Sequence, residues 1–163
     1  MTKKDKTSRL THVDSTGRAR MIDISDKDIV QRHATATAVV TVSPDCAAQI
    51  ADNTIKKGDV LTTAQIAGIT AAKLTPNLIP MCHQLRLDHI DVECRLIDNT
   101  IRITAKVSCR ERTGVEMEAL TAASVAALTV FDMCKAVDPA MVIGPVRVEN
   151  KTKNGKVSFD RSK

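Results

Sequence analysis

The stretch that most constrains the fold is EMEALTAASVAALTVFDMCK, residues 116–135, in which no residue between Glu118 and Asp132 carries a formal charge. Its alanine, valine and leucine side chains go most of the way round a helical projection, so the segment has no polar stripe. A helix that is apolar all round is buried. A bilayer span needs roughly 20 predominantly apolar residues, and this stretch is shorter. We therefore predict a buried core helix over about residues 114–137 and no transmembrane span.

The size of the chain, 163 residues, is typical of one domain that can bury a core. We expect the charged residues 1–9 to form a disordered basic tail and residues 10–163 to form a single domain. The net charge of +5 suits either phosphorylated small molecules or nucleic acid. However, the only aromatic residues are Phe131 and Phe159, too few for the stacking platforms of RNA- and single-strand-binding proteins. We therefore expect no nucleic-acid partner.

The cysteine pattern indicates the compartment. The five cysteines are Cys46, Cys82, Cys94, Cys109 and Cys134. Their odd number and the absence of a CxxC pair favour reduced, buried thiols in a cytoplasmic protein. The adjacent residues Cys82 and His83 lack a second ligand pair, so we predict no metal site. The N-terminal MTKKDKTSRL has no apolar segment of the kind found in secretory signals.

The first half of the chain predicts one strand and two helices. From Arg32 the residues alternate, with alanines and valines on one face, as in a half-buried strand. Ser43-Pro44-Asp45 has the features of a helix start, and this helix is expected to run to Lys57 and stop at Gly58. A second helix is expected from Thr62-Thr63 to Thr75, because a proline at 76 disfavours helical backbone in the residue before it.

The second half predicts a hairpin, the long buried helix and a final pair of strands. Residues 77–84, NLIPMCHQ, read as a proline-interrupted loop, and the alternating runs 86–97 and 100–111 form a hairpin. Residues 145–152 form the last strand, which 156–161 extends as a second hairpin. The resulting order is close to the split βαβ, or ferredoxin-like, arrangement. We therefore predict an α+β fold with an antiparallel sheet and helices packed on one face.

Two glutamates precede the buried stretch. Thr113 and Glu116 have the S/T-x-x-E spacing of a capping box, in which the glutamate bonds back to the threonine N–H. Glu118 points to another side of the helix and has no capping role. Its carboxylate can accept two parallel hydrogen bonds from an N–H/NH₂ edge such as that of guanine or a reduced pterin. We therefore favour capping for Glu116 and ligand binding for Glu118.

Asp132 and Lys135 are three residues apart and so are neighbours on the helix surface. They form either an ion pair at the helix end or a general acid/base pair, in which partial burial leaves Lys135 able to lose a proton near neutral pH. The spacing leaves both interpretations open. Glu118 and Asp132 are separated by about 21 Å along the helix axis, at 1.5 Å per residue. If both serve one site, a second copy of the chain must complete it.

Three cations and one histidine need separate explanations. Lys73 follows two isoleucines at helical spacing, Lys57 lies beside a glycine, and Arg32 shares the alanine face of the first strand. Snorkelling at a helix end explains either lysine. Three inward cations without matching acids would instead suit a polyphosphate. A packed or solvated side chain is the ordinary explanation of His83.

Several segments resemble cyclic pyranopterin monophosphate synthase, an enzyme family of molybdenum cofactor biosynthesis. These segments are LIPMCHQL, TGVEMEALTAASVAALTVFDMCKAVD and KKGDVLTTAQIAGITAAK, with LTHVD and MIDISDKDIVQR near the start. GVEMEALTA together with DMCKAV is too specific a combination for chance agreement. The resemblance runs from about Leu10 to Val148.

The resemblance implies a ferredoxin-like fold assembled as a homohexamer, a trimer of dimers with active sites at the dimer interfaces. It implies a lyase that converts 3′,8-cyclo-7,8-dihydro-GTP to cyclic pyranopterin monophosphate and releases diphosphate. No cofactor is obligatory, although Mg²⁺ can accompany the triphosphate. By position, Asp132 is the catalytic acid/base and Lys135 its partner. The residues implied to bind substrate are Met81, Cys82, His83, Glu116, Met117, Glu118, Lys57, Lys73 and Arg32.

The C-terminal segment ENKTKNGKVSFD departs from the glycine-rich tail usual in that family, and we assign no substrate contact to it. Gln84 replaces a usual proline, and Val130-Phe131 replaces a frequent Ile-Tyr pair. The alternative function is a non-catalytic nucleotide-binding protein of the same fold. A third interpretation is a nucleic-acid-binding protein. Its affinity for nucleic acid would fall steeply as the salt concentration rises.

Overall fold

The structure is a computed structural model that describes residues 17–163. The predicted tail, residues 1–9, and the LTHVD segment lie outside the described residues. In chain order the elements are β1 (Val30–Thr41), α1 (Pro44–Ala51), α2 (Val60–Leu78), β2 (Leu87–Ile97), β3 (Thr100–Glu111), α3 (Glu116–Cys134), β4 (Val142–Lys153) and β5 (Lys156–Asp160). Every strand expected from the sequence is present.

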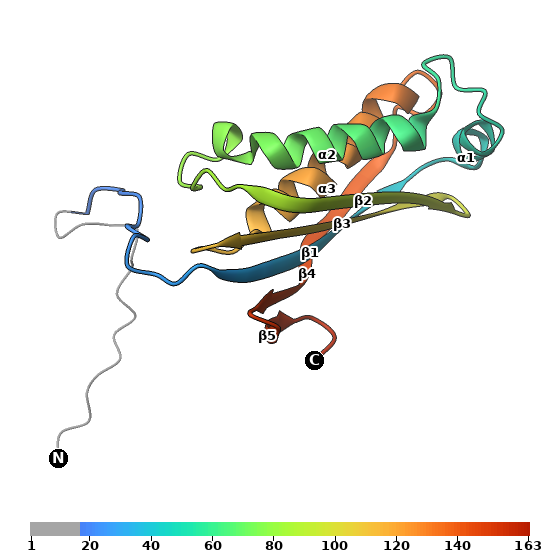
Figure 1. Cartoon of the computed structure of the whole chain (residues 1–163). Helices are drawn as coiled ribbons and strands as arrows, with labels where there is room; N and C mark the ends of the chain where they lie inside the picture. Colours follow the sequence, from blue (N-terminus) through green and yellow to red (C-terminus); the bar gives the residue numbers. More distant parts are fainter. Residues whose placement is uncertain (1–16) are drawn as a thin grey trace.

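The five strands form one sheet in the order β2-β3-β1-β4-β5, and each neighbouring pair is antiparallel. β3 lies between β1 and β2, and β1 lies between β3 and β4, so each helical connection spans an inserted strand. α2 and α3 lie side by side on one face of this sheet, and α1 lies beyond its end (Figure 1). The predicted ferredoxin-like α+β fold is confirmed.

The core is built largely from small side chains. Ala34, Ala36 and Ala38 of β1 are fully buried beneath the helices, whereas the threonines between them face the other side of the sheet. Five alanines of α3 are also fully buried: Ala119, Ala122, Ala123, Ala126 and Ala127. Small residues at both surfaces let the helices approach the sheet and each other closely, which favours dense packing.

The packing of α3, rather than its length, explains its apolar sequence. By length and composition this helix could cross a membrane, so the exclusion by length alone was wrong. However, 10 of its 19 residues are buried inside the described fold. They contact α2 on one side and the sheet on another. The helix therefore supplies the centre of the core.

Gly68 marks the closest approach of α2 to α3. A Cβ at this position would lie 2.9 Å from the carbonyl oxygen of Ala122, 3.1 Å from Cγ1 of Val92 and 3.3 Å from Cβ of Ala126. We predict that Gly68→Ala lowers the free energy of unfolding by about 1–3 kcal/mol through overpacking. This loss should exceed the gain of about 1 kcal/mol from the higher helix propensity of alanine.

Urea denaturation measures this effect, with Thr70→Ala as the control because Thr70 is exposed on the same helix. The control variant should be as stable as wild type or slightly more stable. A Gly68→Ala variant more stable than wild type would contradict the prediction and show that α3 moves aside at little cost.

Several predicted boundaries were wrong. α1 ends at Ala51 rather than Lys57, because Asn53 adopts a positive φ of 53° and the chain turns to bury Ile55 in the core. α2 begins at Val60, two residues before the predicted start, because the Asp59 side chain accepts from Thr62 N and caps the helix. It also continues through Pro76 to Leu78. The preference of the residue before a proline is only a bias, and here the packing of the helix outweighs it.

Candidate active site

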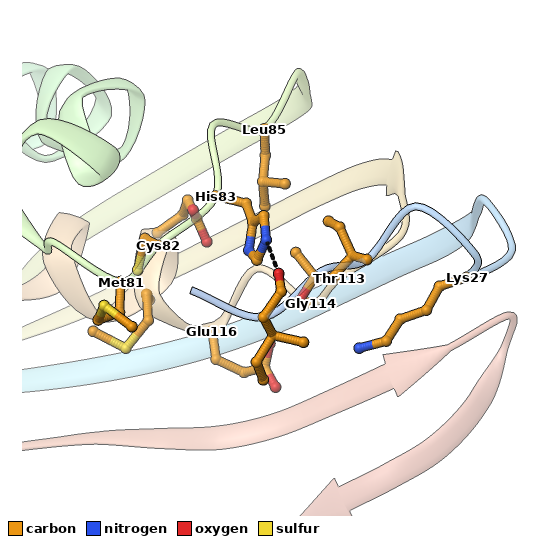
Figure 2. Close-up of a pocket in the computed structure, with 12 residues that line it drawn as sticks. Lys27, Met81, Cys82, His83, Leu85, Thr113, Gly114 and Glu116 are labelled. Carbon is orange, nitrogen blue, oxygen red and sulfur yellow. Dashed lines mark hydrogen bonds between the residues drawn. The ribbon is translucent and has the colours of Figure 1, made fainter. Parts of the chain in front are cut away.

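A cavity of about 320 Å³ lies at the N-terminal end of α3. Three parts of the chain form most of its wall: the loop after α2, the turn between β3 and α3, and the first turn of α3 itself. The residues predicted to bind substrate that line it are Met81, Cys82, His83, Glu116, Met117 and Glu118. Figure 2 shows the Met81–His83 loop on one side and Lys27 reaching in from the other. The structure thus brings six of the nine predicted binding residues together.

His83 connects the cavity wall to the segment that precedes β1. Its Nε2 lies 2.8 Å from the carbonyl oxygen of Ile22, the bond drawn in Figure 2. Because a carbonyl oxygen only accepts, Nε2 must carry the hydrogen. Ile22 and Ile24 line the same cavity, so this bond ties His83 to the segment that supplies these two apolar side chains to the cavity wall.

Glu118 is the buried acid of the cavity, with only 3% of its surface exposed. Burial raises the pKa of this carboxyl, and the negative charge of Glu116 adds to the shift, while its own backbone N–H opposes it. Within residues 17–163, no lysine or arginine forms an ion pair with Glu118. The carboxyl therefore lacks a compensating cation, and its acceptor oxygens suit ligand N–H donors.

The predicted capping box of Glu116 is wrong. The N-cap of α3 is Val115, and no side chain caps this helix. Thr113 lies two residues before the cap, in the cavity wall. The Glu116 carboxylate instead accepts a hydrogen bond of 2.9 Å from Lys151 Nζ on β4. Glu116 thus joins the first turn of α3 to the sheet beside the cavity.

A second charged cluster lies at the other end of α3. Asp132 accepts from Lys57 Nζ at 2.7 Å on one carboxylate oxygen and from Lys135 Nζ at 2.8 Å on the other. Lys57 also donates to the Asp132 carbonyl oxygen at 2.9 Å. Hydrogen bonds and positive charge from Lys135 and Lys57 lower the pKa of Asp132 from 3.8 to about 2. Asp132 is therefore an ionised base near neutral pH.

This cluster, defined by Lys57, Asp132 and Lys135, is open to solvent in a single chain. The side chains of Asp132 and Lys135 are 57% and 55% exposed. The predicted contact between them is present. The partial burial on which the acid/base interpretation depends is absent in a single chain, so another molecule would have to cover Lys135.

The three predicted phosphate-binding cations do not meet within one chain. Lys57 lies in the cluster with Asp132, whereas Arg32 lies near the N-terminal end of α3, where its Nη2 donates to the Arg112 carbonyl oxygen at 3.0 Å. Lys73 is exposed on α2 and does not line the cavity. Because α3 is one continuous helix between Glu116 and Cys134, the two charged ends stay far apart.

Sequence reasoning missed Lys27 and Lys151. Lys27 lies in a polar segment without periodicity, where no local signal distinguishes a site residue. Lys151 lies in the C-terminal segment to which we assigned no contact. Its position in the alternating pattern of β4 could have placed it on the same face as Ala34, its cross-strand partner.

Within residues 17–163, the cysteines and the potential metal ligands form no further site. All five cysteines are free, and four of them are buried. Cys82 is half-buried in the cavity wall, where burial raises the pKa of its thiol. Among the described residues, no three His, Cys, Asp or Glu side chains gather closely enough to hold a metal ion.

Comparison with known proteins identifies the family. The model of the MoaC family matches residues 21–154. The chain belongs to the MoaC family. The match includes every predicted site residue, but it ends before β5. The MoaC relationship therefore covers both the cavity and the cluster around Asp132.

Curated MoaC relatives are similar over most of the chain. A protein of Streptomyces griseus is 54% identical over 145 residues, which cover 89% of this chain and 82% of the relative. A protein of Brevibacillus brevis is 49% identical, with coverage of 95% and 98%. A protein of Staphylococcus haemolyticus is 54% identical, with coverage of 89% and 94%. Each of the three is named cyclic pyranopterin monophosphate synthase.

The low pKa of Asp132 predicts how the cluster affects stability. A carboxyl whose pKa is about 2 in the folded chain and near 3.8 when unfolded stabilises the fold above about pH 4. That contribution disappears as the pH falls through about 2. We therefore expect Asp132→Asn to melt below wild type at pH 6, and the difference should shrink between pH 4 and pH 2.

Thermal denaturation of both proteins across this range measures the difference, which should be small because the pair is exposed. Between pH 5 and pH 8 the difference should stay constant. If the difference in Tm changed mainly between pH 5 and pH 8, a titrating group other than Asp132 would be responsible for it.

Proposed function

We propose that the chain is a cyclic pyranopterin monophosphate synthase of molybdenum cofactor biosynthesis. It would convert (8S)-3′,8-cyclo-7,8-dihydroguanosine 5′-triphosphate to cyclic pyranopterin monophosphate with release of diphosphate, a lyase reaction. The observation that carries the proposal is the identity of about half of all residues with synthases along nearly the whole chain. The buried, uncompensated Glu118 carboxyl in the cavity supports it independently, because the guanine-derived ring carries N–H and NH₂ donors.

Asp132 and Lys135 are the proposed catalytic pair. Asp132 is ionised near neutral pH and can accept a proton, while the Lys135 ammonium 2.8 Å away can donate one. Lys57 holds the carboxylate from its other side. A group within hydrogen-bond reach of both charges could thus lose a proton to one residue and gain a proton from the other.

The proposed binding residues form two groups, one for the ring system of the substrate and one for its phosphates. Met81, Cys82, His83, Met117 and Glu118 hold the ring system in the cavity, with Glu116 at its edge. The cations Lys57, Lys73 and Arg32 screen the triphosphate and the leaving diphosphate. Fixed positive charges near developing negative charge lower the energy of a transition state.

We further propose that a second copy of the chain completes each site, in a homohexamer built as a trimer of dimers. The two halves of the site lie about 21 Å apart along one helix, too far for one small substrate to bridge. The exposed surfaces of α2 and α3 carry large apolar side chains, and this supports the proposal that a second copy of the chain binds there. Ile66 is 60% exposed, Leu128 is 58% exposed, and Leu74 and Leu78 are also exposed. Such patches favour protein contacts.

Assembly would also change the chemistry of the Asp132 cluster. A partner that covers Lys135 would remove water from its surroundings, and this desolvation would make the ammonium a readier proton donor. The substrate is a small molecule, and we propose neither nucleic acid nor membrane as a partner. No cofactor is obligatory, although Mg²⁺ can accompany the triphosphate. The five free cysteines support a cytoplasmic location.

The test is incubation of the purified protein with the cyclised dihydro-GTP, followed by chromatography and mass spectrometry of the products. We expect cyclic pyranopterin monophosphate and one diphosphate per turnover. Substrate binding without product would favour the non-catalytic nucleotide-binding protein. Tight, strongly salt-dependent binding of RNA or DNA would favour the third interpretation.

A further inference from the structure

A second hollow, of about 210 Å³, lies next to the cavity and shares Gly114 and Glu116 with it. Its other wall comes from β1 and from the C-terminal hairpin, β4 and β5. Arg32, Lys151, Lys153 and Ser158 line this wall. We call it the hairpin hollow. It contains three cationic side chains and one acid, so its net charge is positive.

Two of these cations lie side by side on neighbouring strands of the sheet. Arg32 of β1 pairs with Lys153 of β4 in the antiparallel register. Like charges directly opposite each other on neighbouring strands are destabilising. Within the described part of the chain, Lys153 forms no ion pair or side-chain hydrogen bond, and the one acid, Glu116, is already paired with Lys151. The fold thus places two cations together without an acid between them.

Arg32 is held in place before any ligand arrives. Its Nε donates to the Glu111 carbonyl oxygen at 3.4 Å, and its Nη2 donates to the Arg112 carbonyl oxygen at 3.0 Å. These bonds orient the guanidinium and leave other N–H groups available. A guanidinium is a good partner for phosphate oxygens. Because it is already oriented, little side-chain freedom is lost on binding.

Ser158 adds a hydroxyl from the last strand. Its Oγ lies 3.2 Å from the Lys151 carbonyl oxygen, to which it donates. This long bond can be exchanged for one to a phosphate oxygen. Glu116 would repel an anion, but the Lys151 ammonium at 2.9 Å neutralises it. An anion in the hollow would therefore meet Arg32, Lys153 and a hydroxyl.

We propose that the hairpin hollow is a phosphate subsite, in which Lys153 and Ser158 bind the phosphate chain of the substrate and the diphosphate that is released. The inference rests on the proposed function for the identity of the phosphate compound. The charge pattern itself requires only a small polyanion. Arg32, Lys151 and Lys153 lie inside the family match over residues 21–154, whereas Ser158 of the same wall lies beyond it.

Calorimetric titration with inorganic diphosphate tests the subsite without turnover. We expect wild-type protein to bind it and Lys153→Ala to bind it roughly tenfold more weakly, the usual effect of losing a charge-assisted hydrogen bond. The matched control is Lys156→Ala. Lys156 lies opposite Lys153 in the same hairpin and is exposed, but it does not line the hollow. The affinity of Lys156→Ala for diphosphate should stay within about twofold of that of wild type.

A charge reversal separates binding from folding. Lys153→Glu places an acid opposite Arg32, so its Tm should equal or exceed that of wild type while diphosphate binding is lost. If Lys153→Ala fails to fold, Lys153→Gln removes the charge and keeps the side-chain length. Equal affinity in the Lys153 variants and Lys156→Ala, or no diphosphate binding by wild type, would overturn the proposal.

Substrate kinetics distinguish the two proposals from each other. Lys153→Ala should raise KM for the cyclised dihydro-GTP about tenfold with little change in kcat, because the phosphate contact is made in both ground and transition states. Diphosphate binding that depends on Lys153, without any product formation, would support an anion site and refute the synthase. Product formation with diphosphate binding independent of Lys153 would refute the subsite alone.

Discussion

Asp132→Asn should lower kcat by at least about 10²-fold while the substrate still binds. The amide keeps the shape of the carboxylate but cannot accept the proton. It also removes the negative charge between Lys57 and Lys135, so these lysines repel each other and attract the triphosphate more strongly. Substrate affinity should therefore stay the same or increase. Single-turnover rates and equilibrium binding of the substrate measure the two effects separately.

The matched control for this variant is Asp91→Asn. Asp91 also forms an ion pair with a lysine, Lys106, at 3.6 Å, but it lies on β2 and belongs neither to the cavity nor to the cluster around Asp132. Its activity should equal that of wild type. If Asp132→Asn turned over within about tenfold of wild type, Asp132 would not be the general acid or base of the reaction.

A mixture of Glu118→Ala and Asp132→Ala, each inactive alone, should regain activity once the subunits exchange. If each site takes Glu118 from one chain and Asp132 from its partner, a mixed dimer holds one site with both defects and one intact site. Because a two-fold interface is self-complementary, random mixing should restore about a quarter of the wild-type sites. The two single variants must first be shown to be inactive, and native mass spectrometry must verify the exchange.

The double variant, Glu118→Ala with Asp132→Ala, supplies the control. When the double variant is mixed equally with wild type, about half of all sites are intact before exchange. After exchange about a quarter should be intact, because a mixed dimer contains no intact site. If both residues served one site within the same chain, the mixture would stay at about half. The first mixture would then also remain inactive. In that case the substrate would have to span the distance of about 21 Å between Glu118 and Asp132 of one helix.

Local patterns in the sequence were sufficient for most of the architecture. Alternation at period 2 predicted β1, β2 and β3, because a strand exposes successive residues to opposite faces. A long stretch without charge predicted α3 as the central helix. The spacing of three residues predicted the contact between Asp132 and Lys135, which the structure has at 2.8 Å. Each of these features depends on residues close together in the chain.

The tertiary structure alone decided the partners of the charged residues and the ends of the first two helices. Asp132 meets Lys57, 75 residues away, because the segment before α2 ends beside the C-terminus of α3. Glu116 pairs with Lys151 of β4 instead of capping α3. Such contacts depend on strand register and helix packing, which no local spacing encodes. Residue propensities predict where elements form, whereas burial and long-range packing determine which side chains they bring together.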